Sequence, residues 1–208
     1  LDCSSFFINL NLGYTLKKLI LMNPGPVNVT DKVRDAQLQG DLCHREPEFS
    51  VLMESIRKKL LQAFEIEQEY SAILITGSGT AAMEMAISSC LTPNRSILII
   101  QNGVYGERIS KMADVYKMDK HVLSYNWGET LKITEIEQIL KQDTSIEVIA
   151  MVHHETTTGL LNPLPEIALL AKQYDKRLVV DCISSLGGDD INFKQYPIDF
   201  VVGTANKC

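Results

Sequence analysis

Short apolar runs alternate with helical stretches along most of this chain, a pattern typical of strands and helices that follow one another in an α/β domain. Several of the runs are almost continuously apolar, and such strands are covered on both faces. The sequence therefore predicts the α/β class, with a mostly parallel sheet flanked by helices. The candidate strands are 71–76, 96–101, 120–124, 146–152, 177–182 and 199–204. The helical patterns between them are 79–91, 104–117, 134–141 and 165–175.

Two helices are expected before the first of these strands. A polar helix is predicted over 30–39, with Thr30 as its N-cap, and a second over about 48–65, where apolar residues repeat at helical spacing. Farther along, Thr134 and Glu137 have the spacing of a capping box, which predicts a helix start at Thr134.

The composition excludes some classes of partner. The 208 residues are 45% hydrophobic and 22% charged, with a net charge of −6 at pH 7, as in ordinary globular proteins. Because no dense block of Lys or Arg offsets the negative balance, we expect no nucleic-acid partner. No apolar run reaches the roughly 20 residues of a membrane-spanning helix, so we expect no membrane partner.

The cysteines and the first residues suggest where the protein works and how it is divided. The odd number of cysteines and the lack of CxxC spacing favour reduced thiols in a cytoplasmic protein. The start of the chain has broken apolar runs and no signal-peptide pattern. We interpret 1–18 as a linker or the tail of an upstream segment, and 19–208 as one domain. The cysteines are Cys3, Cys43, Cys90, Cys182 and Cys208.

A glycine-rich turn leads into the helical pattern that starts at 79. It reads Thr76-Gly77-Ser78-Gly79-Thr80. Backbone N–H groups and the helix dipole converge at such a turn, so an anion can bind there. The turn has no Walker lysine and is not GxGxxG, which disfavours a P-loop and a dinucleotide site and leaves a small phosphate group as the candidate ligand. A tight turn with a Ser or Thr cap is the simpler alternative.

Two charged residues follow apolar strands near the end of the chain. Asp181 closes one strand, and an ionised carboxylate there is costly unless it is paired. It is either a hydrogen-bonded cap or the partner of a cation such as a protonated pyridine nitrogen. Lys207 follows another strand. Most lysines are solvated surface charges, but a lysine that a strand delivers into a cleft is a usable amine nucleophile. Ligands of open α/β sheets bind beyond the carboxyl ends of the strands, where both residues are expected.

The segment 153–159 (HHETTTG) follows a fourth candidate strand. Adjacent side chains on a strand point to opposite sides, so His153 and His154 are not expected to share a metal ion. The threonine hydroxyls can donate or accept hydrogen bonds at the strand end. The alternative is the polar start of a loop.

Taken together, GSGT, NGVYGER, HHETTTG, VVDCISSLGG and GTANK resemble segments of the large domain of the class V aminotransferases, pyridoxal 5′-phosphate (PLP) enzymes of fold type I. The resemblance covers about 20–208. Asp181 and Lys207 stand where the family has its aspartate and its Schiff-base lysine. Within the class, NPGPVNVT, CHREPEF, HHETTTG and GTANKC are most similar to 2-aminoethylphosphonate–pyruvate transaminases. Alanine–glyoxylate and serine–pyruvate transaminases share the same ground plan.

The resemblance implies a PLP site and a role for each matching residue. Lys207 would hold the cofactor covalently and carry a proton during transfer, and Asp181 would pair with the pyridine nitrogen. Tyr105 would stack on the ring, and Thr156 would hydrogen-bond its 3′-oxygen. The other implied residues are Ser78, Gly79 and Thr80 for the phosphate, Ser184 for the cofactor and Gly25 for the substrate.

The implied reaction transfers the amino group of 2-aminoethylphosphonate to pyruvate, giving phosphonoacetaldehyde and L-alanine. The alternatives are alanine–glyoxylate or serine–pyruvate transamination and, in another class, a non-catalytic phosphate-binding module in which Lys207 is incidental. The resemblance also implies a homodimer. It places a smaller C-terminal domain, with an arginine for the substrate's acidic group, beyond Cys208. We therefore expect the 208-residue piece alone to be inactive or poorly folded.

Overall fold

The computed structural model describes residues 19–207, so the linker expected at 1–18 lies outside the described residues. The helices are α1 (Asp31–Ala36), α2 (Pro47–Ala63), α3 (Gly79–Ser89), α4 (Val104–Val115), α5 (Ile133–Gln142) and α6 (Leu164–Gln173). The strands are β1 (Ser96–Gln101), β2 (Asp119–Ser124), β3 (Ile146–Val152), β4 (His154–Glu155), β5 (Leu160–Leu161), β6 (Arg177–Asp181) and β7 (Phe200–Val202).

Five of the strands form one parallel sheet in the order β2-β1-β3-β6-β7. This confirms the predicted parallel sheet. In the register of the ladders, Val152 at the end of β3 lies opposite Asp181 at the end of β6, and Asp181 lies opposite Val202 at the end of β7. The segments that follow these strands therefore leave the sheet at the same edge.

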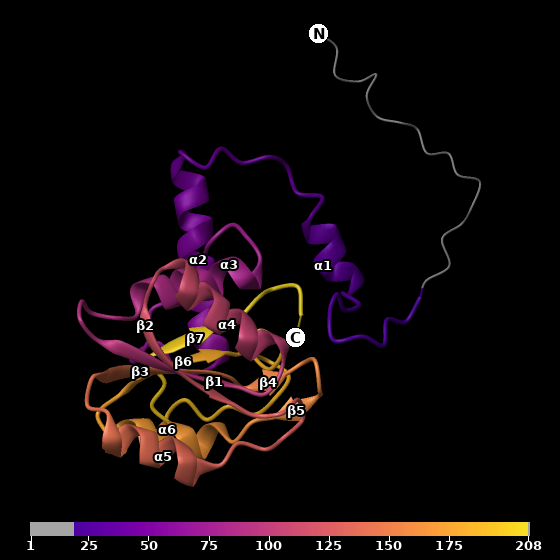
Figure 1. Ribbon diagram of the computed structural model, residues 1–208. Helices are drawn as coiled ribbons and strands as arrows, with labels where there is room; N and C mark the ends of the chain where they lie inside the picture. Colours follow the sequence, from indigo (N-terminus) through magenta and orange to yellow (C-terminus); the bar gives the residue numbers. More distant parts are fainter. Residues whose placement is uncertain (1–18, 208) are drawn as a thin grey trace.

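Helices cover both faces of the sheet, with α3 and α4 on one side and α5 and α6 on the other (Figure 1). Alternate residues of β1 pack against the two helix layers. Leu98 and Ile100 belong to the buried cluster of α5 and α6, whereas Ile97 and Ile99 belong to that of α3 and α4. Because both faces of the strand are buried, both sets of positions must be apolar, which explains the continuous runs in the sequence.

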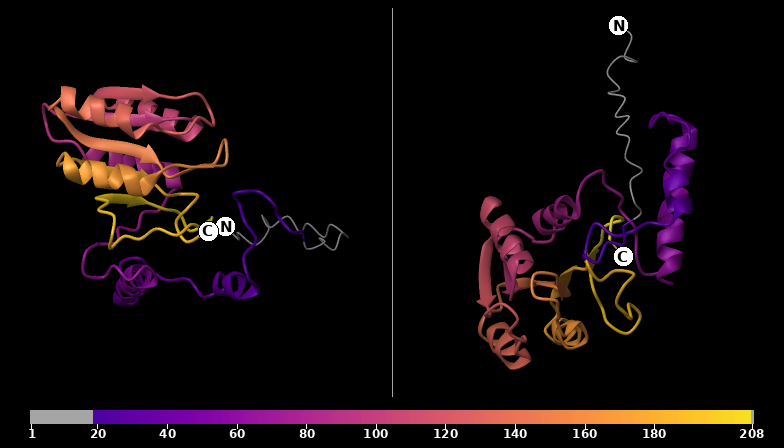
Figure 2. Two further views of the ribbon diagram at one scale, coloured as in Figure 1. Left: turned by 90° about the horizontal axis from the view of Figure 1, so that it is seen from below. Right: turned by 90° about the vertical axis from the view of Figure 1, so that its right-hand side faces the viewer.

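The first two helices lie to one side of this sandwich and have no buried residues of their own (Figures 1 and 2). Thr30 caps α1 as predicted, with its Oγ1 accepting the N–H of Val33 at 3.4 Å. Phe64, directly after α2, packs edge-to-face on Phe193, with ring centroids 5.8 Å apart. This contact attaches the end of α2 to the core. Among the helices of 19–207, none has the length and apolar character needed to cross a membrane.

The strand predicted at 71–76 is wrong. The structure shows an irregular segment there that pairs with no described strand. The side chains of Ile73 and Ile75 are 71% and 38% exposed. Apolar composition favours a strand, but a strand also needs an edge that accepts its hydrogen bonds. The three-residue β7 at this side of the sheet is paired with β6 alone among the described strands.

The capping box predicted at Thr134 and Glu137 is also wrong. Helix α5 starts before Thr134, with Lys132 as its N-cap and no side-chain capping bond. The carboxylate of Glu137 instead accepts a hydrogen bond from Tyr174 Oη at 2.7 Å. The carboxylate of Glu137 is therefore engaged in a tertiary contact with the residue after α6 and does not cap α5.

A short antiparallel hairpin, β4–β5, was not predicted. It pairs His154 with Leu161 and Glu155 with Leu160. Its turn ends at Gly159, whose φ of +69° is in the left-handed region that favours glycine. Two-residue strands are too short to show a period in the sequence. The hairpin presents its threonines at the edge where β3, β6 and β7 end.

Candidate active site

The amine of Lys207 lies at this carboxyl edge among three of the predicted residues. Its Nζ donates a hydrogen bond to Ser184 Oγ at 3.0 Å and lies 5.6 Å from the centroid of the Tyr105 ring. Its aliphatic stem passes against Gly25, where an added Cβ would lie 2.9 Å from Lys207 Cε. The φ of Gly25 is +156°, a value that L-residues rarely adopt. This close approach therefore requires glycine.

Asp181 is a buried carboxylate, 6% exposed, at the end of β6. Its Oδ1 accepts the N–H of Ile183 at 2.9 Å, and no hydrogen-bond donor among the described residues reaches Oδ2. Burial is the main reason why the pKa of Asp181 is raised to about 6. The charge of Glu155 raises the pKa further, whereas Lys207 and Arg108 lower it. A buried carboxylate with one free oxygen is suited to pair with a cation.

The glycine-rich turn forms the N-terminus of α3. Ser78 is the N-cap, and its Oγ accepts the N–H of Ala81 at 3.3 Å. The N–H groups of Gly79 and Thr80 have no intrahelical acceptor, because they belong to the first turn. A Cβ at Gly79 would lie 2.8 Å from the Cδ1 of Ile183. The turn therefore lies against the segment that follows Asp181, as a site for both an anion and a cation requires.

Arg108 adds a cation to this turn and was missed in the sequence. Its Nη1 donates to Thr80 Oγ1 at 3.0 Å, and its guanidinium carbon lies 4.7 Å from the centroid of the Tyr105 ring. Both contacts hold the guanidinium near the N-terminus of α3, where its positive charge and the helix dipole favour an anion. The signal was its position three residues after Tyr105, which puts both side chains on one face of α4.

The hairpin turn joins the site through Thr156, whose hydroxyl hydrogen-bonds with the hydroxyl of Ser184. Ser184 thus contacts both Thr156 and the amine of Lys207. The residues on either side of Thr156, Glu155 and Thr157, bind the start of α4 instead. Glu155 is 0% exposed. Glu155 was not predicted as a site residue, although Thr156 of the same HHETTTG segment was.

The two histidines of the same segment have different hydrogen-bond partners. His153 Nδ1 hydrogen-bonds with Ser185 Oγ at 3.0 Å, and His154 Nδ1 with Asp189 Oδ2 at 2.8 Å. Burial lowers the pKa of His153. In the described part of the chain, no group of His, Cys, Asp and Glu is arranged to hold a metal ion.

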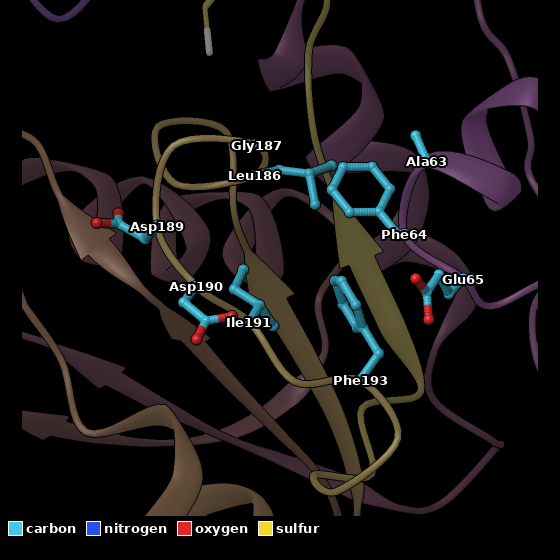
Figure 3. A pocket seen from close by; sticks show the side chains of 9 residues that line it. All are labelled: Ala63, Phe64, Glu65, Leu186, Gly187, Asp189, Asp190, Ile191 and Phe193. Carbon is cyan, nitrogen blue, oxygen red and sulfur yellow. The ribbon is translucent and has the colours of Figure 1, made fainter.

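A cavity of about 390 Å³ lies between the end of α2 and the loop after β6. Figure 3 shows Phe64 next to Leu186, with Phe193 below them and Asp189 on the opposite side. None of the predicted site residues is among the described residues that line it, and Asp189 already binds His154. The lining residues are Ala63, Phe64, Glu65, Leu186, Gly187, Asp189, Asp190, Ile191 and Phe193.

The cluster at the carboxyl edge combines an amine, a buried carboxylate, an aromatic ring and an anion-binding helix start. An amine can bind a carbonyl group covalently, a carboxylate can hold a protonated ring nitrogen, and the helix start can hold a phosphate. The chain is thus an α/β protein whose carboxyl-edge cluster suits a phosphorylated aromatic cofactor.

Comparison with known proteins gives the family. The family model described as aminotransferase class-V matches residues 33–208, and the chain belongs to this family. A 2-aminoethylphosphonate–pyruvate transaminase of Bacillus thuringiensis (strain Al Hakam) is 40% identical over 190 residues, which are 91% of this chain and 52% of that protein. The chain thus spans about half the length of such curated relatives. These matches confirm the resemblance to class V aminotransferases.

Solved structures agree with the fold. A pyridoxamine–pyruvate aminotransferase from Mesorhizobium loti is 26% identical, with a TM-score of 0.84 over 91% of this chain and 48% of that one. An alanine–glyoxylate aminotransferase from Nostoc sp. is 31% identical, with a TM-score of 0.81 over 96% of this chain and 54% of that one. The expected large-domain fold of the class V enzymes is therefore confirmed.

Proposed function

We propose that this chain provides the cofactor site of a PLP-dependent aminotransferase that transfers the amino group of 2-aminoethylphosphonate to pyruvate. The observation that carries the proposal is the placement of the Lys207 amine. It lies 3.0 Å from a serine hydroxyl and 5.6 Å from an aromatic ring, at the edge where Asp181 ends its strand. A solvated surface lysine would have none of these neighbours.

The residues fit PLP, the cofactor of the class V aminotransferases. The first N–H groups of α3 and the guanidinium of Arg108 suit its phosphate. The free Oδ2 of Asp181 suits a protonated pyridine nitrogen, and the ring of Tyr105 offers a stacking face. The hydroxyls of Thr156 and Ser184 suit the ring oxygen. When bound, PLP acts as an electron sink for the carbon that carries the amino group.

The chain's own residues orient the amine and manage protons. The Ser184 hydroxyl accepts from Lys207 Nζ and so fixes the direction of the amine. Lys207 is the group placed to take a proton from the substrate and return it, since general acid–base catalysis requires a positioned side chain. Above a pH of about 6 Asp181 is ionised and can stabilise a positive charge on the ring nitrogen. The space for Lys207 depends on Gly25, which implies a role for Gly25 in the site.

The substrates are proposed from the relatives. Curated relatives named 2-aminoethylphosphonate–pyruvate transaminase are 38–40% identical to the chain. We include in the proposal a homodimer and a cytoplasmic location. The buried free thiols of Cys90 and Cys182 are compatible with a reducing compartment.

The test is a comparison of three assays with PLP on the purified protein at the full length of its curated relatives, of which this chain spans about half. We expect phosphonoacetaldehyde from 2-aminoethylphosphonate and pyruvate, with slower turnover of alanine with glyoxylate and of serine with pyruvate. Lys207→Ala should abolish turnover, whereas Lys172→Ala, at an exposed position on α6, should not change it. Preference for glyoxylate would refute the proposed substrates and favour the alanine–glyoxylate alternative. Activity in none of the three assays would refute the function itself.

A further inference from the structure

The start of α4 carries Tyr105 and has no local cap. Its N-cap is Gly103, which has no side chain to accept from the first N–H groups of the helix. The first bond from helix to N-cap backbone is that of Glu107 N–H to Gly103 O at 3.1 Å. The N–H groups of Val104, Tyr105 and Gly106 therefore need acceptors from elsewhere.

The turn of the β4–β5 hairpin supplies these acceptors, although it lies about fifty residues away in the sequence. Thr157 Oγ1 accepts the N–H of Val104 at 3.3 Å. Oε1 of Glu155 accepts the N–H of Tyr105 at 3.4 Å, and Oε2 accepts the N–H of Gly106 at 3.2 Å. One carboxylate thus binds two consecutive N–H groups at the positive end of the helix dipole.

Glu155 is itself held in one place. It is 0% exposed, and its Oε1 accepts from the hydroxyl of Thr157 at 2.7 Å and from the backbone N–H of Thr157 at 3.2 Å. An added Cβ at Gly103 would collide with its side chain. A buried carboxylate is tolerated where several donors and a helix N-terminus compensate its charge, as they do here.

The neighbouring hydroxyl links the same turn to the amine. Thr156 stands between Glu155 and Thr157 and hydrogen-bonds with Ser184, which accepts from Lys207 Nζ. One hairpin turn therefore contacts both the helix that carries Tyr105 and the serine that orients the amine.

We propose that Glu155 is a positioning residue that holds the N-terminus of α4 in place and thereby sets the ring of Tyr105 over the cofactor site. The proposal rests on the proposed function for the role of the ring and on the structure alone for the cap. Glu155 makes no hydrogen bond to Lys207 or Asp181 among the described residues. Its charge raises the pKa of Asp181, but its hydrogen bonds lead to the backbone of Tyr105 and Gly106.

The first experiment measures hydrogen exchange in the purified protein without PLP. Glu155→Gln keeps the shape of the side chain but turns one acceptor into a donor. Backbone amides of 102–108 should exchange about tenfold faster or more, as expected for the loss of a hydrogen bond to a charged group, while amides of α6 stay unchanged. The matched control is Glu166→Gln, an exposed glutamate in the first turn of α6, which should leave 102–108 unaffected.

Thr157→Val provides a second variant if Glu155→Gln folds poorly. It removes the acceptor of Val104 N–H and the hydroxyl that donates to Glu155, but it keeps the carboxylate as acceptor for Tyr105 and Gly106, so exchange in 102–108 should rise by a smaller factor. Unchanged exchange in both variants would overturn the cap. Faster exchange throughout the sheet would also overturn it, because the effect would then be a general loss of stability.

The second experiment is a double-mutant cycle on the PLP dissociation constant. Glu155→Gln should weaken binding by about tenfold in the wild-type background and by less than about twofold in Tyr105→Ala, since residues that act through one another are coupled. Equal effects in both backgrounds would refute positioning through Tyr105. If the wild type itself does not bind PLP, the proposed function fails, and the exchange experiment still decides whether Glu155 holds the start of α4.

Discussion

Replacing Asp181 by Asn removes a charge that the folded protein buries. Burial raises the pKa of Asp181 from 3.8 to about 6, a shift of about 2 units. Each unit corresponds to about 1.36 kcal/mol, so the ionised carboxylate destabilises the fold without cofactor by about 3 kcal/mol at pH 7.5. Asn keeps an oxygen for the N–H of Ile183 but has no charge. The free energy of unfolding at pH 7.5 should therefore be higher for Asp181→Asn than for the wild type.

The pH dependence of this difference has a definite sign. Because the folded pKa lies above the unfolded one, the native state holds the proton more tightly between pH 4 and pH 6. The stability of the wild type relative to Asp181→Asn is therefore greatest below pH 4 and falls as the pH rises to about 6. Above that pH the difference is constant.

The assay is urea unfolding of the PLP-free protein at a series of pH values, with Asp190→Asn, an exposed position, as the matched control. The free energies of wild type and control should change together with pH, and that of Asp181→Asn should diverge from both. PLP should stabilise the wild type more than the variant, since only the carboxylate can pair with a ring cation. A difference between wild type and Asp181→Asn that does not change with pH would show that the Asp181 carboxylate is not destabilised by burial.

Two further predictions follow from close packing and from burial. Gly25→Ala places a Cβ 2.9 Å from Lys207 Cε at a φ that L-residues rarely adopt, so it should weaken PLP binding by about tenfold, equivalent to about 1.4 kcal/mol. The control Gly40→Ala lies in open space and should bind PLP normally. Equal PLP titration curves for the two variants would contradict the close packing at Gly25. At pH 8, a thiol reagent should label the exposed Cys43 and spare Cys90, because burial raises the pKa of Cys90 to about 11. Peptide mass spectrometry measures the labelling, and rapid labelling of Cys90 in the folded protein would contradict its burial.

The strands that could be predicted most directly are those in the interior of the sheet, where burial on both faces requires a continuous apolar run. β1, β3 and β6 are buried on both faces, so their apolar runs could be read directly. The segment 71–76 has the same composition but no partner strand among the described residues. Composition reports burial and β-propensity; it does not report which edge is available.

The residues of the candidate site could likewise be predicted only in part. The turn at Ser78, the strand end at Asp181 and Lys207 were found because each follows a recognisable local pattern, and the structure brings them to one edge. Their roles toward PLP stay predictions. Arg108 and Glu155 were missed because their importance lies in contacts across 28 and about fifty residues. A single sequence does not show which distant partner a polar residue will meet.

The proposed attachment of PLP to Lys207 can be detected chemically. The purified protein is mixed with PLP, reduced with borohydride and digested, and the peptides are examined by mass spectrometry. We expect loss of the visible absorption band and a pyridoxyl group on Lys207 alone, with no modified peptide from Lys207→Ala. A PLP-binding protein whose pyridoxyl group lies on another lysine, or on none, would contradict it.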